Sequence, residues 1–265
     1  MKGILIFLIS AQFAYGGFEG DKNDARAAGL ANALICIDGS AWALFHNAGG
    51  LAGLKKIQIG LAHSPGLYNL NELNSTAAVI GLPVSIGSFG ALFRKYGFTL
   101  YTEYSLGIGY AFSLTDLHLG FNCTYHNVRI AGYGSDGAVA FSIGLLINIL
   151  QELDAGIAVK NINSPKIGRS YEKMPLATVC GFSYRPVKDL SISIDIEKEE
   201  NFPAEIRCGM EYLIIDLCAI RAGMGSESIH YSGGIGLHLS EFQFDYGVTV
   251  HKYLGVTHFF TITFI

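Results

Sequence analysis

The sequence predicts an all-β protein: a fourteen-stranded antiparallel transmembrane β-barrel with a short N-terminal helical hatch in its lumen. Three observations predict it. Apolar residues alternate with small or polar ones in fourteen successive runs, an export signal precedes them, and the connections alternate between tight turns and longer loops. In the run FQFDYGVTVH (242–251), for example, one face is apolar and the other polar, because a strand sends successive side chains to opposite sides. A closed barrel in a membrane needs this pattern in every strand.

Residues 1–16 are predicted to be a cleaved secretory signal peptide. Lys2 precedes the apolar stretch GILIFLISA (3–11), and the small residues Ala14 and Gly16 suit signal peptidase. No later stretch approaches 18 consecutive apolar residues, although the mean hydropathy is +0.35. We therefore expect the outer membrane of a Gram-negative-type bacterium and its lipid as the surroundings. A net charge of −4 argues against nucleic acid as a partner.

Residues 17–54 are predicted to form the hatch. DARAAGLANA (24–33) is rich in alanine and favours a short helix, and DGSAWALFHN (38–47) is typical of a turn that caps a second helix. AGGLAG (48–53) then leads into the wall, which we place at 55–265. The inner face of the wall indicates the same arrangement, because runs such as SLGIGYAFS (105–113) carry mostly small residues there, which leaves room for a plug.

The wall is predicted as fourteen strands with short turns after each even-numbered run. The connections after odd-numbered runs are mostly longer, which is how bacterial barrels separate periplasmic turns from outer loops. The expected strands are 56–63, 74–85, 88–97, 102–113, 117–131, 138–149, 153–160, 174–185, 190–198, 204–214, 217–225, 229–239, 242–252 and 256–265.

The alternation also assigns side chains to the two faces of the wall. Aromatic residues on the lipid face are expected to form interfacial girdles: Tyr104, Tyr110, Phe112, Tyr125, Phe182, Tyr184, Phe242 and Tyr246. A ladder of charges is expected on the lumen face: Arg185, Asp195, Glu197, Glu205, Arg207, Glu211 and Arg221. Opposite charges on adjacent strands would pair and hold the hatch, and an ion-selective constriction is the alternative.

No catalytic or metal site is predicted, and no cofactor. The five cysteines show no metal-ligand spacing, and four of them (Cys123, Cys180, Cys208 and Cys218) fall on the apolar face. His118 and His126 share a face but are separated by roughly 26 Å of strand. The lumen-facing Ser and His residues between 230 and 240 have no evident third partner, so we expect a protein that is not an enzyme.

The stretch ARAAGLANALICIDGSAWALFHNAGGLAGL (25–54) resembles the N-terminal hatch of the PorV/PorQ group within the FadL-type outer-membrane barrels. LDAGIAVKNINSP (153–165), MPLATVCGFSYRPVKDLSISIDIEK (174–198) and LGVTHFFTITFI (254–265) resemble wall segments of the same group. Fourteen strands are usual in that family. The hatch motif falls on Arg26, Gly29, Asp38, Asn47, Leu51 and Ala52, and the closing-strand motif on Thr257 and His258. Ala48 stands where the motif has proline, and the outer loops are short for the group.

The resemblance implies two functions. The first is a carrier or docking component of a type IX-like secretion system, with translocon or surface-attachment proteins and their cargo as partners. The alternative is FadL-like transport of small hydrophobic molecules such as fatty acids, and a purely structural barrel is a third reading. Lateral exit through the wall needs an interrupted strand, for which Gly81 and Pro83 are the candidate kink. Protein docking predicts exposed apolar loop tips, for which 65–68 is the candidate.

Overall fold

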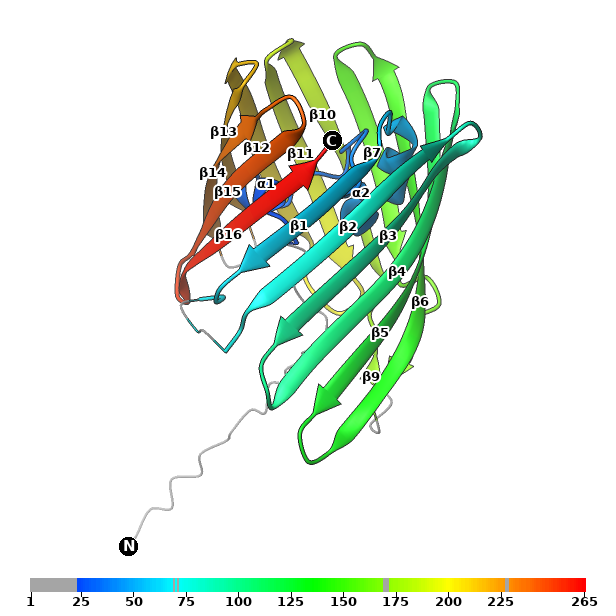
Figure 1. Cartoon of the computed structure of the whole chain (residues 1–265), viewed down its shortest axis with the longest axis vertical. Coiled ribbons are helices and arrows are strands. Elements are labelled where there is room, and N and C mark those ends of the chain that lie inside the picture. The colour runs from blue at the N-terminus through cyan, green and yellow to red at the C-terminus, as the bar shows by residue number, and fades with distance from the viewer. Residues whose placement is uncertain (1–22, 69, 71, 169–171, 227–228) are drawn as a thin grey trace, which may run out of the picture.

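Fourteen antiparallel strands close into a barrel in the computed structural model, which describes residues 23–68, 70, 72–168, 172–226 and 229–265. Each strand pairs with its neighbours along the chain, and β1 closes the circle on β16, with Ile59 opposite Phe264 (Figure 1). The wall consists of β1 (Gln58–Ser64), β2 (Ser75–Val84), β3 (Gly87–Gly97), β4 (Tyr101–Leu114), β5 (Leu117–Ile130), β6 (Gly134–Leu150), β7 (Leu153–Lys160), β10 (Ala177–Val187), β11 (Leu190–Glu199), β12 (Glu205–Ile215), β13 (Cys218–Gly225), β14 (His230–His238), β15 (Phe242–His251) and β16 (Gly255–Phe264). The predicted fold class is therefore confirmed.

The two ends of the barrel differ in their connections. Tight turns such as 85–86, 115–116 and 216–217 lie at one end, which we call the turn end. The longer connections lie at the other, the loop end (Figure 1). The longest of them, 161–176, contains a small hairpin of β8 (Lys166–Ile167) and β9 (Glu172–Lys173), where the sequence predicts only a loop.

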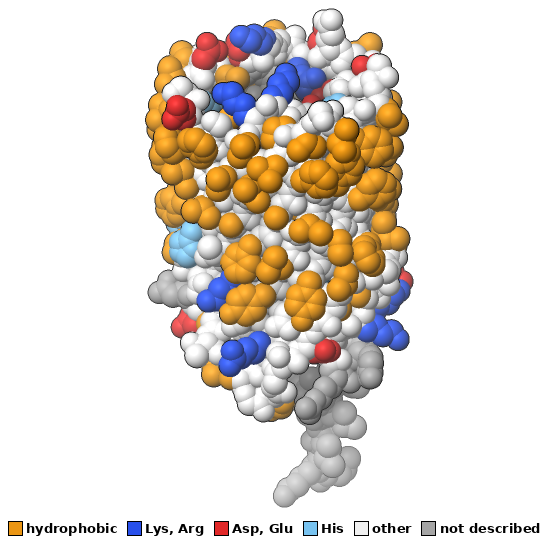
Figure 2. Space-filling model, turned by 45° about the vertical axis from the view of Figure 1, so that its right-hand side comes forward, with side chains coloured by type: hydrophobic (Ala, Val, Ile, Leu, Met, Phe, Trp, Pro, Cys, Tyr) orange, Lys and Arg blue, Asp and Glu red, His pale blue; other side chains and the backbone are white. Residues whose placement is uncertain are grey.

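The two faces of the wall have opposite chemistry. In β1 buried and exposed residues alternate strictly, and the exposed ones include Ile59 and Leu61. The same alternation around the barrel gives a broad apolar belt between two charged ends (Figure 2). None of the helices in the described part of the chain is long and apolar enough to span a membrane.

The segment from Asn23 to Leu54 lies inside the barrel, and we call these residues the hatch. It contains α1 (Ala25–Gly29), α2 (Ala43–His46) and the 3-10 helix η1 (Ala48–Gly53). Asp24 caps α1, since its Oδ1 accepts a hydrogen bond from the Ala27 amide at 2.9 Å. α1 contacts β14, β15 and β16, whereas η1 contacts β4, β5 and β6, so the hatch spans the lumen from wall to wall (Figure 1).

Glycines on the inner wall allow this close fit. A Cβ on Gly120 of β5 would lie 2.2 Å from the carbonyl carbon of Ala48, well inside contact distance. A Cβ on Gly144 of β6 would lie 2.0 Å from Oδ1 of Asn47. Side chains at these positions would occupy the space that the hatch backbone now fills.

The strand interruption expected at Gly81 and Pro83 is absent. β2 pairs with β3 residue for residue from Ser75 to Val84. Its last pair with β1 joins Gly81 to Gln58, so Pro83 lies beyond that ladder and its missing N–H breaks no pairing there. Register shifts occur instead beside the tight turns of β6–β7, β10–β11 and β12–β13.

We predict that Gly120→Ala destabilises the protein by about 1–3 kcal/mol, because the new methyl group must displace buried hatch backbone. The measurement is the free energy of unfolding in urea for protein folded into lipid vesicles. Gly233→Ala is the matched control, since its Cβ would meet nothing closer than 3.8 Å. That control is expected to leave stability unchanged or slightly raised. Equal losses in both variants would contradict the close fit.

Candidate functional site

A network of buried charges joins α1 of the hatch to the wall. Arg26 donates two hydrogen bonds to Glu211 of β12, from Nε to Oε2 at 3.0 Å and from a terminal nitrogen to Oε1 at 2.8 Å. The same carboxylate accepts from Nε of Arg221 at 2.5 Å, and Arg221 reaches Asp245 Oδ1 at 2.7 Å. The negative charge of Glu211 holds the pKa of Arg26 above its ordinary value. Two cations and two anions therefore compensate one another, with Arg221 and Asp245 buried and Arg26 and Glu211 partly exposed.

The other charges of the predicted ladder form separate pairs. Arg207 pairs with Glu197 and with Glu205, and Arg185 pairs with Asp154 of β7. Asp195 lies opposite Arg207 in the β11–β12 register, yet its Oδ2 accepts the backbone N–H of Ile35 in the hatch at 2.8 Å. The alternation along each strand predicts the face of each of these residues. It does not predict that Asp154 and Asp245 are their partners, because these two aspartates lie outside the four neighbouring runs of the predicted ladder.

A second ionic contact lies within the hatch. His46 Nε2 is 3.3 Å from Asp24 Oδ2, and both side chains are almost completely buried. Burial alone would raise the pKa of Asp24, but the hydrogen bond and charge of His46 outweigh it and leave that pKa below its ordinary value of 3.8. The contact ties the cap of α1 to α2, and no motif in the sequence pointed to it.

Of the hatch motif, Asn47 makes the most contacts with backbone groups. Its Nδ2 donates to the carbonyl oxygens of Ile35 at 2.8 Å and Leu145 at 3.0 Å, and its Oδ1 accepts from the Gly49 amide at 3.0 Å. One side chain thus links two parts of the hatch to β6.

The remaining motif residues have simpler surroundings. Gly29 lies against Gly234 of β14, and Leu51 is fully buried in the apolar core with Ala52 packed beside it. Asp38 Oδ1 accepts from the Gly39 amide at 2.9 Å and lies 3.2 Å from His118 Nδ1. On β16, Thr257 accepts a hydrogen bond from the Tyr68 amide, and His258 bonds the hydroxyl of Tyr246.

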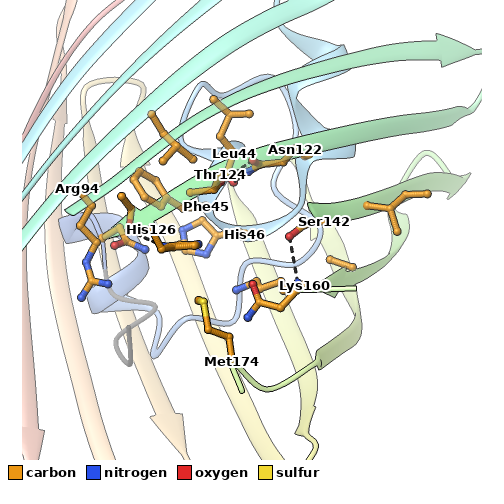
Figure 3. A pocket seen from close by; sticks show the side chains of 17 residues that line it. Leu44, Phe45, His46, Arg94, Asn122, Thr124, His126, Ser142, Lys160 and Met174 are labelled. Atoms are coloured by element: carbon orange, nitrogen blue, oxygen red, sulfur yellow. Dashed lines mark hydrogen bonds between the residues drawn. The ribbon is translucent and has the colours of Figure 1, made fainter. Parts of the chain in front are cut away.

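A cavity of about 140 Å³ lies on the loop side of the hatch, and we call it the loop-side cavity (Figure 3). Arg94, Ser105 and His126 stand opposite one another on β3, β4 and β5, with Ser105 Oγ 2.8 Å from His126 Nδ1. Its lining residues are Asn23, Leu44, Phe45, His46, Ala48, Leu92, Arg94, Ser105, Asn122, Thr124, His126, Ser142, Ile143, Ala158, Lys160, Asn161 and Met174.

The lining of the loop-side cavity combines apolar side chains with positive charge. Leu44, Phe45, Leu92 and Met174 supply hydrocarbon surface. Arginine, lysine and histidine supply the ionisable groups, and none of the described lining residues is an aspartate or glutamate. Such a lining suits a hydrocarbon body with an anionic group at one end.

A second cavity, of about 370 Å³, lies at the turn end on the other side of the hatch, and we call it the turn-side chamber. Both signs of charge line it, together with three serines of β10 and β11 that bond one another. Cys36 of the hatch also lines it, and burial, followed by the nearby Asp195 and Asp154, raises the pKa of this thiol.

Neither cavity offers a metal site among the residues that the structure describes, because no three His, Cys, Asp or Glu side chains come together in that part of the chain. Cys36 is buried in the hatch, whereas Cys123, Cys180, Cys208 and Cys218 belong to wall strands, and all five are free thiols. The arrangement thus provides charged and apolar surfaces for binding.

The fold is similar to that of known outer-membrane channels. The toluene transporter TodX of Pseudomonas putida matches with a TM-score of 0.60 at 10% identity, over 87% of this chain and 95% of that one. A FadL homologue of Pseudomonas aeruginosa matches with a TM-score of 0.59 at 11% identity, over 91% of this chain and 97% of that one. No protein-family model and no curated protein matches the sequence. At these identities the likeness shows a FadL-type barrel fold.

We predict that Arg221→Met destabilises the protein by about 3–5 kcal/mol, because it leaves two buried carboxylates without their shared cation. The measurement is again the unfolding free energy in lipid vesicles. The control is Lys173→Met, which removes the solvent-exposed pair with Glu200 at the loop end and is expected to change stability little. A small effect of Arg221→Met would show that the network does not hold the hatch.

Proposed function

We propose that the protein is an outer-membrane channel, without catalytic activity, for small hydrophobic molecules that carry an anionic head group, such as fatty acids. The loop-side cavity carries this proposal, because its lining pairs hydrocarbon surface with the cationic side chains of Arg94 and Lys160 and contains no described carboxylate. The apolar belt of the wall supports a position in lipid, which would be the barrel's other partner. The fold shared with a toluene transporter and a FadL homologue supports transport over the secretion role.

The predicted ligand preference follows from the head group. We expect laurate to bind more tightly than dodecanol, which has the same chain length and no charge. Arg94→Gln combined with Lys160→Gln should weaken laurate about tenfold or more, because a charge-assisted hydrogen bond contributes about 1.5–3 kcal/mol. Dodecanol binding should stay the same. Isothermal titration calorimetry of the folded protein in detergent measures both.

Arg129→Gln is the matched control, because Arg129 is exposed at the end of β5 and does not line the loop-side cavity. Equal affinity for the acid and the alcohol would exclude recognition of the head group at this cavity. An equal loss in the Arg129→Gln variant would place the effect elsewhere on the molecule. Absence of binding by either ligand would refute the transport proposal.

A secretion carrier of the PorV/PorQ kind is the second candidate, and one observation favours it. Tyr133 and Tyr253, at two tips of the loop end, are 79% and 75% exposed, as a docking surface for another protein would require. At the loop tip suggested by the sequence, Tyr68 is 37% exposed, whereas Leu67 packs against α1 and Phe259.

The secretion candidate predicts that translocon or surface-attachment proteins co-purify with the native barrel from outer membranes in mild detergent. Mass spectrometry identifies them, and Tyr133→Ala with Tyr253→Ala should remove them. Purification of the barrel without such proteins would exclude this role.

A further inference from the structure

The loop-side cavity and the turn-side chamber lie along the same two wall strands. On β7 the first cavity ends at Ala158 and the second begins at Asp154. On β6 the corresponding residues are Ile143 and Asn148. At about 3.4 Å per residue, the strands run only about 14–17 Å between the two spaces. The hatch separates them over this short distance.

Two hatch residues form the barrier, and we call Ile35 and Asn47 the clasp. The Asn47 amide holds the Ile35 carbonyl at 2.8 Å and the Leu145 carbonyl of β6 at 3.0 Å. Glycines of the wall lie directly under both residues: a Cβ on Gly144 would be 2.0 Å from Asn47 Oδ1, and one on Gly156 would be 2.6 Å from the Ile35 carbonyl oxygen. The wall therefore contributes no side chains at these two positions.

The other sides of the hatch are sealed more firmly. The α1 side is fixed by the buried charges around Glu211 and Arg221. The α2 and η1 side packs Trp42, Leu44 and Leu51 into the largest apolar cluster of the described residues. Beside the clasp the apolar cluster has only five members, which are Ile35, Cys36, Leu146, Ala158 and Val179. The Ile35 amide also donates to Asp195 of β11 at 2.8 Å. At the point where the two cavities approach each other, the seal thus depends on a few hydrogen bonds and the smaller apolar cluster.

We propose that the clasp closes an axial passage along β6 and β7, with the turn-side chamber as its exit. The continuous pairing of β2 with β3 agrees with this route, because it offers no opening through the wall at the position where the sequence suggested one. The polar lining of the chamber means that a permeating molecule leaves into water at the turn end rather than sideways into lipid. The identity of that molecule rests on the proposed function, whereas the passage itself can be tested with simple ions.

The first test compares Asn47→Ala with Gln58→Ala in planar lipid bilayers containing potassium chloride. Gln58 of β1 also makes two hydrogen bonds to hatch backbone, to the Ala41 amide and the Gly39 carbonyl, but it lines neither cavity. Asn47→Ala should raise the open fraction about tenfold or more, because it removes the hydrogen bonds to Ile35 and Leu145 and a single such bond can contribute about a factor of ten. Gln58→Ala should stay closed. Equal opening in both variants would mean a generally loosened hatch and would overturn the proposal.

The second test uses substitutions in the wall, which leave the hatch sequence unchanged. Gly144→Ala should open the passage by displacing Asn47. Gly247→Ala is the control, because its Cβ would lie 2.3 Å from the Ala25 carbonyl oxygen and would disturb the hatch at α1 instead. Gel mobility without heating shows that each barrel is folded. If neither Asn47→Ala nor Gly144→Ala opens, or if Gly247→Ala opens as readily as Gly144→Ala, the proposal is wrong.

Cys36 reports where the current flows, because it lines the turn-side chamber next to the clasp. Opening the passage would expose the Cys36 thiol to water and remove the burial that raises its pKa. A positively charged methanethiosulfonate reagent, which the nearby Asp195 and Asp154 attract, should therefore react with Cys36 and reduce the current through Asn47→Ala. It should leave the current through Asn47→Ala with Cys36→Ala unchanged. If the reagent leaves the current through Asn47→Ala unchanged, the ions do not pass Cys36. That result would overturn the assignment of the passage to β6 and β7. If laurate does not bind but the bilayer results are as expected, the proposed function is refuted and the axial passage is still supported.

Discussion

Closure of the sheet on itself is the constraint on which the rest of the molecule depends. Once β1 pairs with β16, every wall strand has two partners and no backbone edge remains open to lipid. Closure also fixes the width of the lumen, which the inward side chains of the wall are too small to fill. The number of strands sets the size of this space. The hatch fills it, the inner glycines make room for the hatch, and the charges hold the hatch in place.

The hatch meets its surroundings with two kinds of chemistry. On the α1 side, guanidinium and carboxylate groups compensate one another, and removing Arg221 would leave the buried carboxylate of Asp245 without its cation. On the α2 side, leucines and Trp42 pack into an apolar cluster with small wall residues. The hatch is therefore held by charge pairing on one side of the barrel and by apolar packing on the other.

Strand number, side-chain faces and the presence of a hatch could be predicted, because the two-residue period of a strand is visible within each short run of residues. The partners of the hatch could not. Arg26 and Glu211 are 185 residues apart, and only the closed barrel brings them together. The loop-side cavity was missed for the same reason, since its lining comes from the hatch, five strands and a loop. The kink expected at Pro83 is absent because a proline interrupts a ladder only where a neighbouring strand would accept a hydrogen bond from its nitrogen. The ladder between β1 and β2 ends at Gly81, before Pro83.

The contacts of the hatch with the last strand also set an order for assembly. The Ala25 amide bonds Thr261, and the Trp42 indole bonds Thr263, across 236 and 221 residues of chain. Neither bond can form until the C-terminal strand has arrived, and that strand is also the one that closes the β1–β16 seam. Sealing the seam and seating the hatch are therefore one cooperative event, and that late, non-local step is expected to limit the folding rate.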